Sequence, residues 1–246
     1  MINTKKNLII PLLILAGLTN SCQKPQRIIQ IGEHEVVATP IITEDFTHHM
    51  SCWTVEQLPG GTVAVKDGKM DVDDFSGCTV WLNEKLQVPL MIEYDAVVVS
   101  AGGPNDRVSD LNCFWLAKDI HSPNDFFKNS ESRGGKFQNY HDMQLYYVGL
   151  GGHDNTKTRF RRYAGGGDRP CLPKHDLSDK QYLITPNAIN RIRIVVYNNR
   201  VQYYRNDQLI YDFSDKAPYT NGYFGIRTFK NHMTFDNFHV YSLTEK

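Results

Sequence analysis

The chain has 246 residues, and its 27 Lys and Arg residues balance 27 Asp and Glu residues. This balance disfavours nucleic acid as a partner, because domains that bind nucleic acid concentrate positive charge. About two hundred residues follow the N-terminal segments described next, an ordinary length for one β-sandwich, so we expect one core and not two.

The first residues form a targeting segment. Lys5 and Lys6 precede an apolar run at residues 8–18 that is too short to span a bilayer as a stable helix. The run ends in LTNSC, which resembles the lipobox of bacterial lipoproteins, where small residues precede an acylated cysteine. We therefore expect a signal peptide at residues 1–21 and lipidation of Cys22, which would hold the protein to the membrane of the cell envelope. An ordinary secretory signal with an incidental cysteine is the alternative.

The remaining chain divides into a tether and a domain. Residues 22–37 are polar and lack a strong period, which is typical of a tether between a membrane and a domain. We place a single domain at residues 38–246. It contains Cys52, Cys78, Cys113 and Cys171, so either two disulfides in three connectivities or buried free thiols fit the count.

Short runs of β-branched and aromatic residues follow one another with turn residues between them, and helical periodicity is hard to find. Asn198-Asn199 and Asn206-Asp207 separate alternating runs and tolerate the left-handed backbone of hairpin turns. We therefore predict an all-β fold of two packed antiparallel sheets. The expected strands are 62–66, 79–83, 90–100, 112–117, 143–149, 157–163, 191–197, 201–205, 208–213, 223–229 and 233–241.

Alternation within a strand predicts which side chains share a face. In residues 157–163, the basic residues at 157, 159 and 161 share a face with Tyr163. In the last strand, Phe238 falls on one face and Phe235 on the other. This pattern predicts rings on both faces of that sheet, as in a sheet whose exposed side binds a ligand.

Both ends of the domain resemble concanavalin-like jelly rolls of the laminarinase and lectin type. The opening carries Glu44-Asp45-Phe46 and VKDGKMDV at 65–72, and the close carries GYFGIR at 222–227 and FDNFHVY at 235–241. The resemblance implies a jelly-roll sandwich. Jelly rolls of this superfamily often bind or cleave glycans, and fold-level analogy supplies only a prior for function.

The middle of the chain is similar to an uncharacterised lipoprotein family that is common in glycan-degrading Bacteroidota-type bacteria. The residues that carry this resemblance are SDLNCFW at 109–115, YYVGLGG at 146–152 and TRFRRY at 158–163. It implies an envelope location and no particular chemistry.

Charge is sorted along the chain. Residues 67–110 carry nine acidic and three basic side chains, and residues 133–175 carry eight Lys or Arg against three Asp. Such segregation marks a surface that meets a charged partner, or else two solvated faces.

A retaining glycosidase is disfavoured. The glycosidases of this superfamily carry an E-x-D-x-x-E strand whose carboxylates act as nucleophile and acid. Glu93 and Asp95 begin this pattern, but Val98 stands where the second glutamate would be. We expect Glu93 and Asp95 to have rim or hydrogen-bonding roles.

A polysaccharide lyase acting on an acidic glycan, or another eliminating enzyme, is the leading hypothesis. Such chemistry needs a base, an acid, and a cation or amide that stabilises the enolate beside a uronate carboxyl group. One stretch with a Gly-rich loop between two expected strands offers these groups. The catalytic candidates are His141, Tyr147, Arg159, Arg161 and Tyr163. The substrate-binding candidates are Asn112, Gln144, Tyr146, Asn155, Arg227 and His232, with His153 beside them.

Three other hypotheses stay open. A glycan-binding or scaffold module would use tyrosines with Trp53, Trp81 or Trp115 as a stacking platform, although tryptophans in apolar strands are mostly core. An enzyme that eliminates or hydrates 3-keto-glycosides is a fold-level analogy. A purely structural envelope protein would scatter the Arg, Tyr and His candidates over different faces.

We expect no cofactor and no catalytic metal. The chain has no phosphate loop, GxSxG elbow or HExxH helix, and the cysteine spacings match no zinc ribbon. Structural calcium could use Asp71, Asp73 and Asp74, or Asp154 with Asn155, at an edge of the sandwich.

Overall fold

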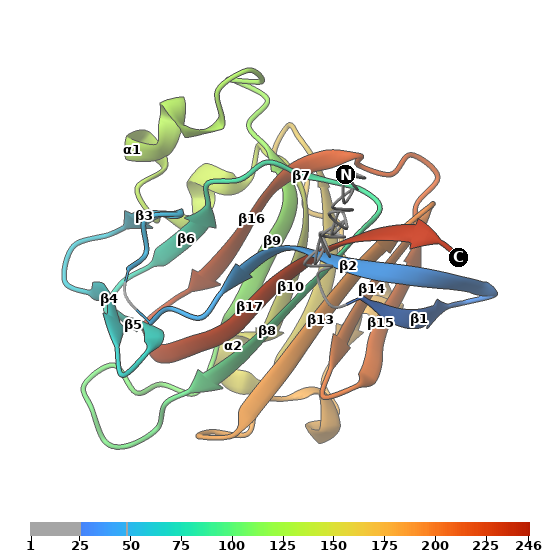
Figure 1. Ribbon diagram of the computed structural model, residues 1–246. Coiled ribbons are helices and arrows are strands. Elements are labelled where there is room, and N and C mark those ends of the chain that lie inside the picture. The colour runs from blue at the N-terminus through green and yellow to red at the C-terminus, as the bar shows by residue number, and fades with distance from the viewer. Residues whose placement is uncertain (1–25, 48) are drawn as a thin grey trace, which may run out of the picture.

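The chain folds into two antiparallel β-sheets that stack face to face (Figure 1). The computed structural model describes residues 26–47 and 49–246. The helical elements of this part of the chain are single turns of three or four residues. The predicted all-β sandwich of two antiparallel sheets is therefore confirmed.

The first sheet has nine strands and contains both ends of the described chain. From edge to edge, its main path is β1 (Arg27–Ile31), β2 (His34–Glu44), β17 (Asn231–Glu245), β8 (Leu90–Val98), β13 (Ile189–Tyr197), β14 (Arg200–Arg205) and β15 (Gln208–Ser214). Where β2 ends, β5 (Lys69–Asp74) pairs with the first part of β17. β4 (Thr62–Lys66) in turn pairs with β5.

The second sheet has eight strands and, as shown below, carries the candidate site. Its main path is β12 (Asp176–Leu177), β11 (Lys157–Ala164), β10 (Gln144–Gly151), β9 (Leu111–Lys118), β16 (Asn221–Thr228), β6 (Cys78–Leu82) and β3 (Trp53–Gln57). The short β7 (Leu86–Gln87) pairs with the start of β16.

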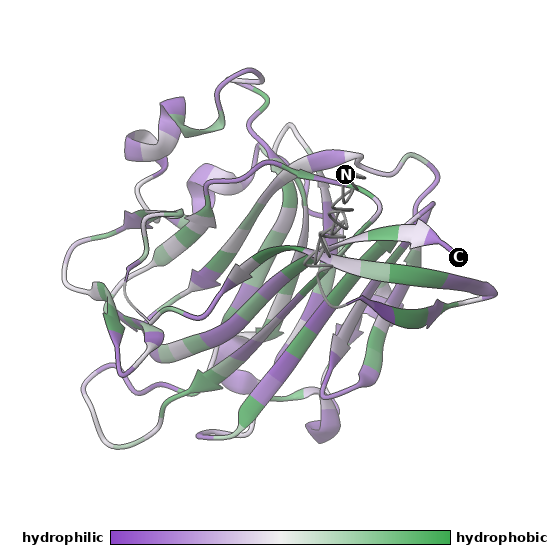
Figure 2. Cartoon of the chain, viewed as in Figure 1, coloured by the Kyte–Doolittle hydropathy of each residue, from purple (hydrophilic) through white to green (hydrophobic). Residues whose placement is uncertain are grey.

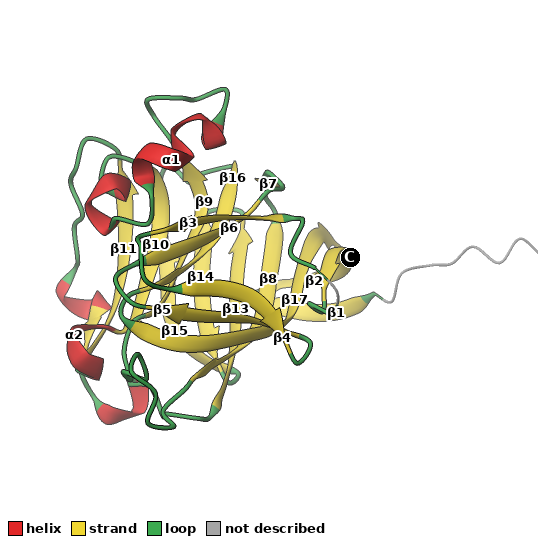
Figure 3. Cartoon of the chain, turned by 90° about the vertical axis from the view of Figure 1, so that its left-hand side faces the viewer, coloured by secondary structure: helices red, strands yellow, loops and turns green. Residues whose placement is uncertain are grey.

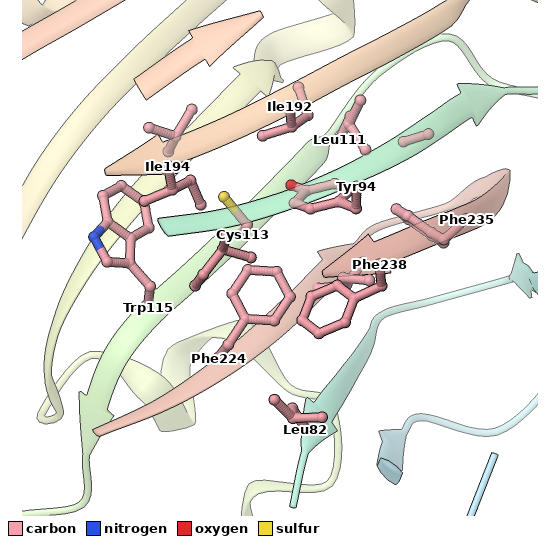
Figure 4. Packing of buried hydrophobic residues seen from close by; sticks show 14 of the residues in the cluster. Leu82, Tyr94, Leu111, Cys113, Trp115, Ile192, Ile194, Phe224, Phe235 and Phe238 are labelled. Atoms are coloured by element: carbon pink, nitrogen blue, oxygen red, sulfur yellow. The ribbon is translucent and has the colours of Figure 1, made fainter. Parts of the chain in front are cut away.

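Aromatic side chains from both sheets fill the space between them. Tyr94 of β8 packs on Phe224 of β16 with ring centroids 5.7 Å apart, and Phe224 packs on Phe238 of β17 at 5.2 Å. Figure 4 shows these rings beside Trp115 and Cys113 of β9. Burial of this apolar area is the main force that holds the two sheets together.

Alternation along the strands agrees with this packing. In β11, Thr158 and Phe160 are buried toward the core, whereas Arg159 and Arg161 on the other face are partly exposed. Hydrophilic and hydrophobic bands alternate along many strands in Figure 2. Both hairpins predicted from Asn and Asp turns are present, with positive φ at Asn198, Asn206 and Asp207.

The domain begins earlier than the expected boundary at residue 38. β1 and β2 form a hairpin at the edge of the nine-stranded sheet, so residues 27–37 are not a tether. The hairpin is held because Val36 is fully buried and packs with Ile31 and Met91. The expected signal peptide and Cys22 lie outside the described residues. No helix within the described part of the chain is long and apolar enough to cross a membrane.

The last strand does not alternate as expected. Its pairing with β8 shifts register between Asp236 and His239, and Asn237 has a φ of +50°. This β-bulge adds one residue to the strand, so Phe235 and Phe238 both point into the core at 1% exposure. The prediction that this strand carries rings on both faces is therefore wrong for this pair.

A helical segment at residues 119–142 covers part of the outer face of the eight-stranded sheet. It contains η1 (Phe126–Asn129), α1 (Ser130–Arg133) and η2 (Phe137–Tyr140), and α1 ends at Gly134 in the left-handed conformation. Phe126 packs on Trp81 with ring centroids 4.9 Å apart. Figure 3 shows that the short helices lie along one side of the sandwich.

The four cysteines of the described chain are free thiols. Cys78 and Cys113 are buried, Cys171 is partly buried and Cys52 is exposed. The structure therefore agrees with the free-thiol alternative and not with two disulfides.

Candidate functional site

Strand register places a row of polar residues across the outer face of the eight-stranded sheet. Asn112 on β9 pairs with Arg227 on β16 and, on its other side, with Gly149 on β10. Gly149 pairs with Arg159 on β11. Paired residues of antiparallel strands point to the same face, so these residues share one face although they are far apart in the sequence.

The next row, two residues further along each strand, is aromatic. Phe114 on β9 pairs with Tyr147 on β10, and Tyr147 pairs with Arg161 on β11. A Cβ atom at Gly149 would lie 2.4 Å from the hydroxyl oxygen of Tyr147. The phenol of Tyr147 therefore extends over Gly149 toward the polar row, where the missing side chain leaves room for it.

The helical segment forms a wall beside these rows, and a buried ionic network holds it there. The guanidinium of Arg133 donates to Glu56 Oε1 at 2.6 Å and to Asp119 Oδ2 at 3.0 Å. The Tyr140 hydroxyl donates to Glu56 Oε2 at 2.7 Å. Since Glu56 belongs to β3, the network connects the segment directly to the sheet.

Two adjoining cavities lie between the wall and the polar row, and together we call them the groove. The inner pocket has a volume of about 200 Å³ and is lined by Leu58, Ser76, Asp110, Asn112, Lys136, Phe137, Gln138, Tyr147, Arg227 and Phe229. The outer pocket has a volume of about 310 Å³ and is lined by Arg107, Asp110, Phe137, Tyr147, Gly149, Gly152, His153, Lys157, Arg159, Arg161, Arg169 and Phe229. Their shared lining residues make them one continuous site.

The groove is strongly cationic. Its lining carries one carboxylate, Asp110, against the basic residues Arg107, Lys136, Lys157, Arg159, Arg161, Arg169 and Arg227. Some of this charge is neutralised within the protein, since Arg107 pairs with Asp110 at 2.9 Å and Arg159 with Asp176 at 3.0 Å. Among the described residues, no carboxylate lies within 4.0 Å of the charged nitrogens of Arg161 or Arg227. An anionic ligand would supply the missing negative charge.

Arg227 is the most buried of these cations, at 2% exposure. It donates to the backbone carbonyl of Gly135 and to Thr79 Oγ1, and it stacks on the ring of Phe137 with its guanidinium carbon 5.4 Å from the centroid. These contacts fix its orientation without neutralising its charge. A fixed, weakly hydrated guanidinium is well suited to bind a carboxylate.

Tyr147 and Asn112 bring uncommitted polar atoms to the same place. Within the described chain, the Tyr147 hydroxyl makes no hydrogen bond. Burial raises the pKa of Tyr147 well above its usual value, so the phenol keeps its proton and acts as a donor. The buried Asn112 Oδ1 also lacks a partner among the described residues, which leaves an acceptor available for a ligand hydroxyl group.

Two catalytic candidates from the sequence lie outside the groove. Tyr163 is fully buried, and its ring packs on that of Tyr147 with centroids 5.9 Å apart, so it supports Tyr147 from behind. His141 follows η2 and packs edge-on against Phe137 at 5.1 Å. Burial, together with the charge of Arg169, lowers the pKa of His141. Neither residue lines the cavities, whereas Tyr147, Arg159 and Arg161 all do.

Three substrate-binding candidates are also placed elsewhere. Tyr146 points into the core and donates to Asp215 Oδ2 at 2.6 Å, which corrects the expectation that it contacts substrate. Asn155 bonds the backbone of Ile184 through both its side-chain oxygen and its side-chain nitrogen. Gln144 lies at the opposite end of β10, where it bonds Ala164. Asn112 and Arg227 are the substrate-binding candidates that line the inner pocket, and His153 lines the outer pocket.

His232 lies on β17 of the other sheet, and it ties the loop that contains Asp106 to the strands. Its Nε2 is 2.7 Å from Asp71 Oδ2 and its Nδ1 is 3.2 Å from Asp106 Oδ1. Burial opposes the charged ring, but the hydrogen bonds to Asp71 and Asp106, together with the charges of Asp71 and Asp73, raise the pKa of His232. Burial likewise opposes ionisation of Asp71 and Asp106, and yet bonds from His232 help to lower the pKa of each carboxyl.

These shifts predict a pH window for the stability that His232 supplies. The contribution of the protonated ring is complete below the ordinary histidine pKa of 6.5 and is lost as pH rises through the raised value. The contribution of the carboxylates is present above their ordinary pKa of 3.8 and is lost as pH falls through the lowered values. We expect His232→Ala to lower the free energy of unfolding by about 1–2 kcal/mol near pH 5, and by less above about pH 8. Urea unfolding at both pH values tests this, and an equal loss at both would contradict the ionic role.

Several groove residues could not be chosen from the sequence as site residues. Phe137, Lys136 and Gln138 come from the helical segment, and Phe229 from a turn after β16. Asp110 and Arg107 come from the loop before β9. The one signal that pointed to the site was the basic stretch at residues 133–175, which supplies five of the seven groove cations.

The expected calcium ligands already have protein partners. Asp74 accepts hydrogen bonds from the backbone amides of Ser76 and Gly77, and Asp73 accepts one from Asn105. Asp154 pairs with Arg107. No cluster of three or more His, Cys, Asp or Glu side chains within the described chain is arranged to hold a metal ion.

The carboxylates that begin the glycosidase-like pattern lie on the other sheet, away from the groove. Glu93 on β8 pairs with Arg193 at 2.7 Å and with Arg27 at 2.5 Å, and Asp95 bonds Asn237. The tryptophans are not surface platforms, because Trp53 is 6% exposed and Trp81 and Trp115 are fully buried.

Solved structures share this fold at low sequence identity. A Bacillus subtilis protein of unknown function with a galectin-like fold has a TM-score of 0.66 at 15% identity, over 85% of this chain and 100% of that one. A Bacillus licheniformis β-glucanase has a TM-score of 0.55 at 12% identity, over 82% and 97%. The exoplasmic/lumenal domain of VIP36, in its Ca²⁺/Man3GlcNAc-bound form, has a TM-score of 0.54 at 12% identity, over 83% and 89%. The predicted concanavalin-like jelly roll is therefore confirmed.

Comparison by sequence assigns the chain to a family without assigning an activity. No curated protein matches it. One family model, described as a domain of unknown function, matches residues 72–238, which is more than half of the chain and includes most of the groove. This protein therefore belongs to the family of the domain of unknown function DUF6250.

Proposed function

We propose that this protein binds an acidic glycan in the groove. The observation that carries the proposal is the excess of cations over carboxylates in the lining, with Arg161 and Arg227 lacking a carboxylate partner among the described residues. Phe137, Tyr147 and Phe229 add ring surface, and aromatic rings stack well on sugars. The cations would bind the carboxylate of an acidic sugar, and the aromatic rings beside them would pack on its ring.

The fold supports a glycan rather than another anion. Two structural neighbours are described as a β-glucanase and as a domain bound to Man3GlcNAc. At such low identity, the shared fold makes a glycan the expected class of ligand, and the residues of the groove supply the specific argument for an acidic one.

Charge removal tests this proposal. We expect wild-type protein to bind oligouronates more tightly than the matching neutral oligosaccharides, with an affinity that falls as salt rises. Arg161→Gln removes a groove cation whose side chain, among the described residues, donates only to the carbonyl of Arg169, so it should weaken binding about tenfold and leave stability nearly unchanged. The matched control is Arg191→Gln, a 71% exposed arginine beside Asp95 on the other sheet. Calorimetry that detects no preference for charged sugars would overturn the proposal.

Elimination is a second candidate function, and the free hydroxyl of Tyr147 favours it. A base would take the proton at C5 of a uronate, the electron pair would form the C4–C5 double bond, and the C4–O bond would break. Tyr147 would then protonate the departing oxygen, and the groove cations would stabilise the enolate. Asp110 is the groove carboxylate that could accept the C5 proton. Hydrolysis of the glycosidase type needs a pair of carboxylates, and the described lining residues of the groove provide one.

The product separates elimination from binding alone. An eliminating enzyme releases unsaturated sugars that absorb ultraviolet light, whereas a scaffold module binds the same chains and leaves them intact. Native uronate chains that stay intact while an oxidised 3-keto disaccharide is turned over would favour the 3-keto-glycoside alternative instead.

We also propose that the protein works at the cell envelope, held by a lipid on Cys22. The proposal rests on the lipobox-like LTNSC sequence and on the resemblance to envelope lipoproteins. Mass spectrometry of the mature N-terminus tests it, because an acylated Cys22 adds the mass of its lipid chains and an unmodified N-terminus refutes the anchor.

A further inference from the structure

We infer that the groove accepts the end of an acidic glycan chain and not its middle, with the terminal sugar in the inner pocket and its carboxylate at Arg227. This inference rests on the proposed binding function and adds the part of the glycan that is recognised. It follows from the shape of the inner pocket, the rigidity of its wall and the polar atoms that it leaves unpaired.

The inner pocket is closed on the side of the helical segment. Lys136, Phe137 and Gln138 line it there. Beyond them, the sheet face is filled by a packed cluster in which Phe114 and Tyr140 have ring centroids 5.5 Å apart. A glycan lying over the polar row therefore has no open path across the rest of the sheet.

The wall is built to stay in place. Arg133 is 3% exposed and joins Glu56 of β3 to Asp119, while Arg227 donates to the carbonyl of Gly135 next to η2. Opening this wall would separate buried charges from their partners, and that separation is strongly unfavourable. The wall therefore acts as a fixed stop and not as a lid.

Size and chemistry fit one charged sugar. A volume of about 200 Å³ is below the range of about 300–1,000 Å³ that is typical of ligand pockets, so the inner pocket suits a single ring. Arg227 offers a cation without a carboxylate partner in the described chain, and the adjacent Asn112 Oδ1 offers an acceptor without a donor. A uronic acid supplies both matching groups, a carboxylate and neighbouring hydroxyl groups.

The outer pocket then holds the sugars that follow. It is larger, at about 310 Å³, and its lining includes Lys157, Arg159, Arg161 and Arg169. A glycan that enters through the outer pocket contacts these basic side chains first, and its terminal sugar ring then meets the wall of the inner pocket.

Stoichiometry tests the inference. The whole protein is titrated with a series of acidic sugars of increasing length: galacturonate, its dimer, its hexamer and polygalacturonate of known length, and then the matching alginate series. Calorimetry and light scattering measure how many protein molecules bind to each glycan chain. End recognition predicts one protein per chain at every length, and an affinity that stops rising once the groove is filled. Several proteins per long chain would overturn it and leave the binding proposal standing. Absence of binding to every acidic chain would overturn both.

Two lysine variants test where the end of the bound glycan lies. Lys136 lines only the inner pocket and Lys157 only the outer pocket. Lys136→Gln is expected to weaken the monosaccharide and the hexamer by the same factor, whereas Lys157→Gln weakens the hexamer more than the monosaccharide. Circular dichroism confirms that both variants fold. The reverse pattern, with Lys136→Gln affecting only long chains, would contradict the placement of the terminal sugar.

Discussion

Arg133→Met is expected to lower the free energy of unfolding by about 3–5 kcal/mol, the largest stability effect that we predict for a single substitution outside the aromatic core. Arg133 is 3% exposed, and its guanidinium donates to Glu56 at 2.6 and 3.0 Å, to Asp119 at 3.0 Å and to the carbonyl of Phe126 at 2.9 Å. Methionine keeps the apolar part of the side chain but leaves two buried carboxylates without their cation. Denaturant unfolding measures the loss.

The control is an arginine in an exposed pair. Arg191 is 71% exposed and lies 3.9 Å from Asp95, so Arg191→Met should change the free energy of unfolding by less than about 0.5 kcal/mol. A loss below about 1 kcal/mol for Arg133→Met would show that the network does not hold the wall. Adding Glu56→Gln to Arg133→Met should recover part of the loss, because it removes one of the two unpaired charges.

Arg133→Met should also change the shape of the groove. Lys136, Phe137 and Gln138 lie in the wall a few residues after Arg133, so local opening of residues 119–142 would enlarge the inner pocket. Hydrogen exchange is expected to rise in this segment before it rises in β9 or β10. Stability and specificity are thus connected through one buried guanidinium.

The strands were predictable because their signal is local. Alternation with a period of two gave the shared face of Arg159, Arg161 and Tyr163, and Asn or Asp turns gave two hairpins. β5 was not predicted because Asp71, Asp73 and Asp74 within it disfavour a strand. Tertiary partners outweigh that preference, since Lys66 and His232 pair with Asp71, and backbone amides bond Asp74.

The β-bulges could not be predicted from the alternation of residues along a single strand. At Asn237 and at Leu116, positive φ accompanies a break in alternation, so Phe235 with Phe238, and Trp115 with Leu116, face the same core. The sequence shows these residues as a simple pattern, and only the partner strand reveals the extra residue.

The candidate site was predictable only within one hairpin. Tyr147 and Arg161 lie on adjacent strands joined by a short loop, so the sequence places them together. Asn112 and Arg227 join them through pairings between strands that are distant in the sequence. His141 lies near the site in sequence, but it caps η2 behind Phe137, and no periodicity within its short helical turn shows on which side it lies.

Tyr147→Phe is expected to reduce elimination of a uronate chain by about 10²–10⁴-fold while leaving binding within about threefold, if the groove is catalytic as proposed. The substitution removes only the hydroxyl group, and that group makes no hydrogen bond within the described chain, so the fold loses no hydrogen bond. Because burial raises the pKa of Tyr147, the phenol keeps its proton as pH rises through the ordinary tyrosine value of 10.0, and activity should not fall there through loss of this acid.

Gly149→Ala tests the position of the same hydroxyl without removing it. The new methyl group would lie 2.4 Å from the Tyr147 oxygen and 2.9 and 3.0 Å from two of its ring carbons. These three nearest atoms all belong to the Tyr147 side chain, so the phenol has to shift against Phe137 and Tyr163 while the sheet keeps its pairing. We expect elimination to fall about as far as in Tyr147→Phe, since a misplaced acid cannot reach the leaving oxygen. Tyr203→Phe is the control, because its hydroxyl also lacks a partner in the described chain but is buried in the core between the sheets, outside the groove. Full activity in Gly149→Ala would show that proton donation does not depend on where Tyr147 places its hydroxyl, and the acid would then have to be sought among the other groove residues.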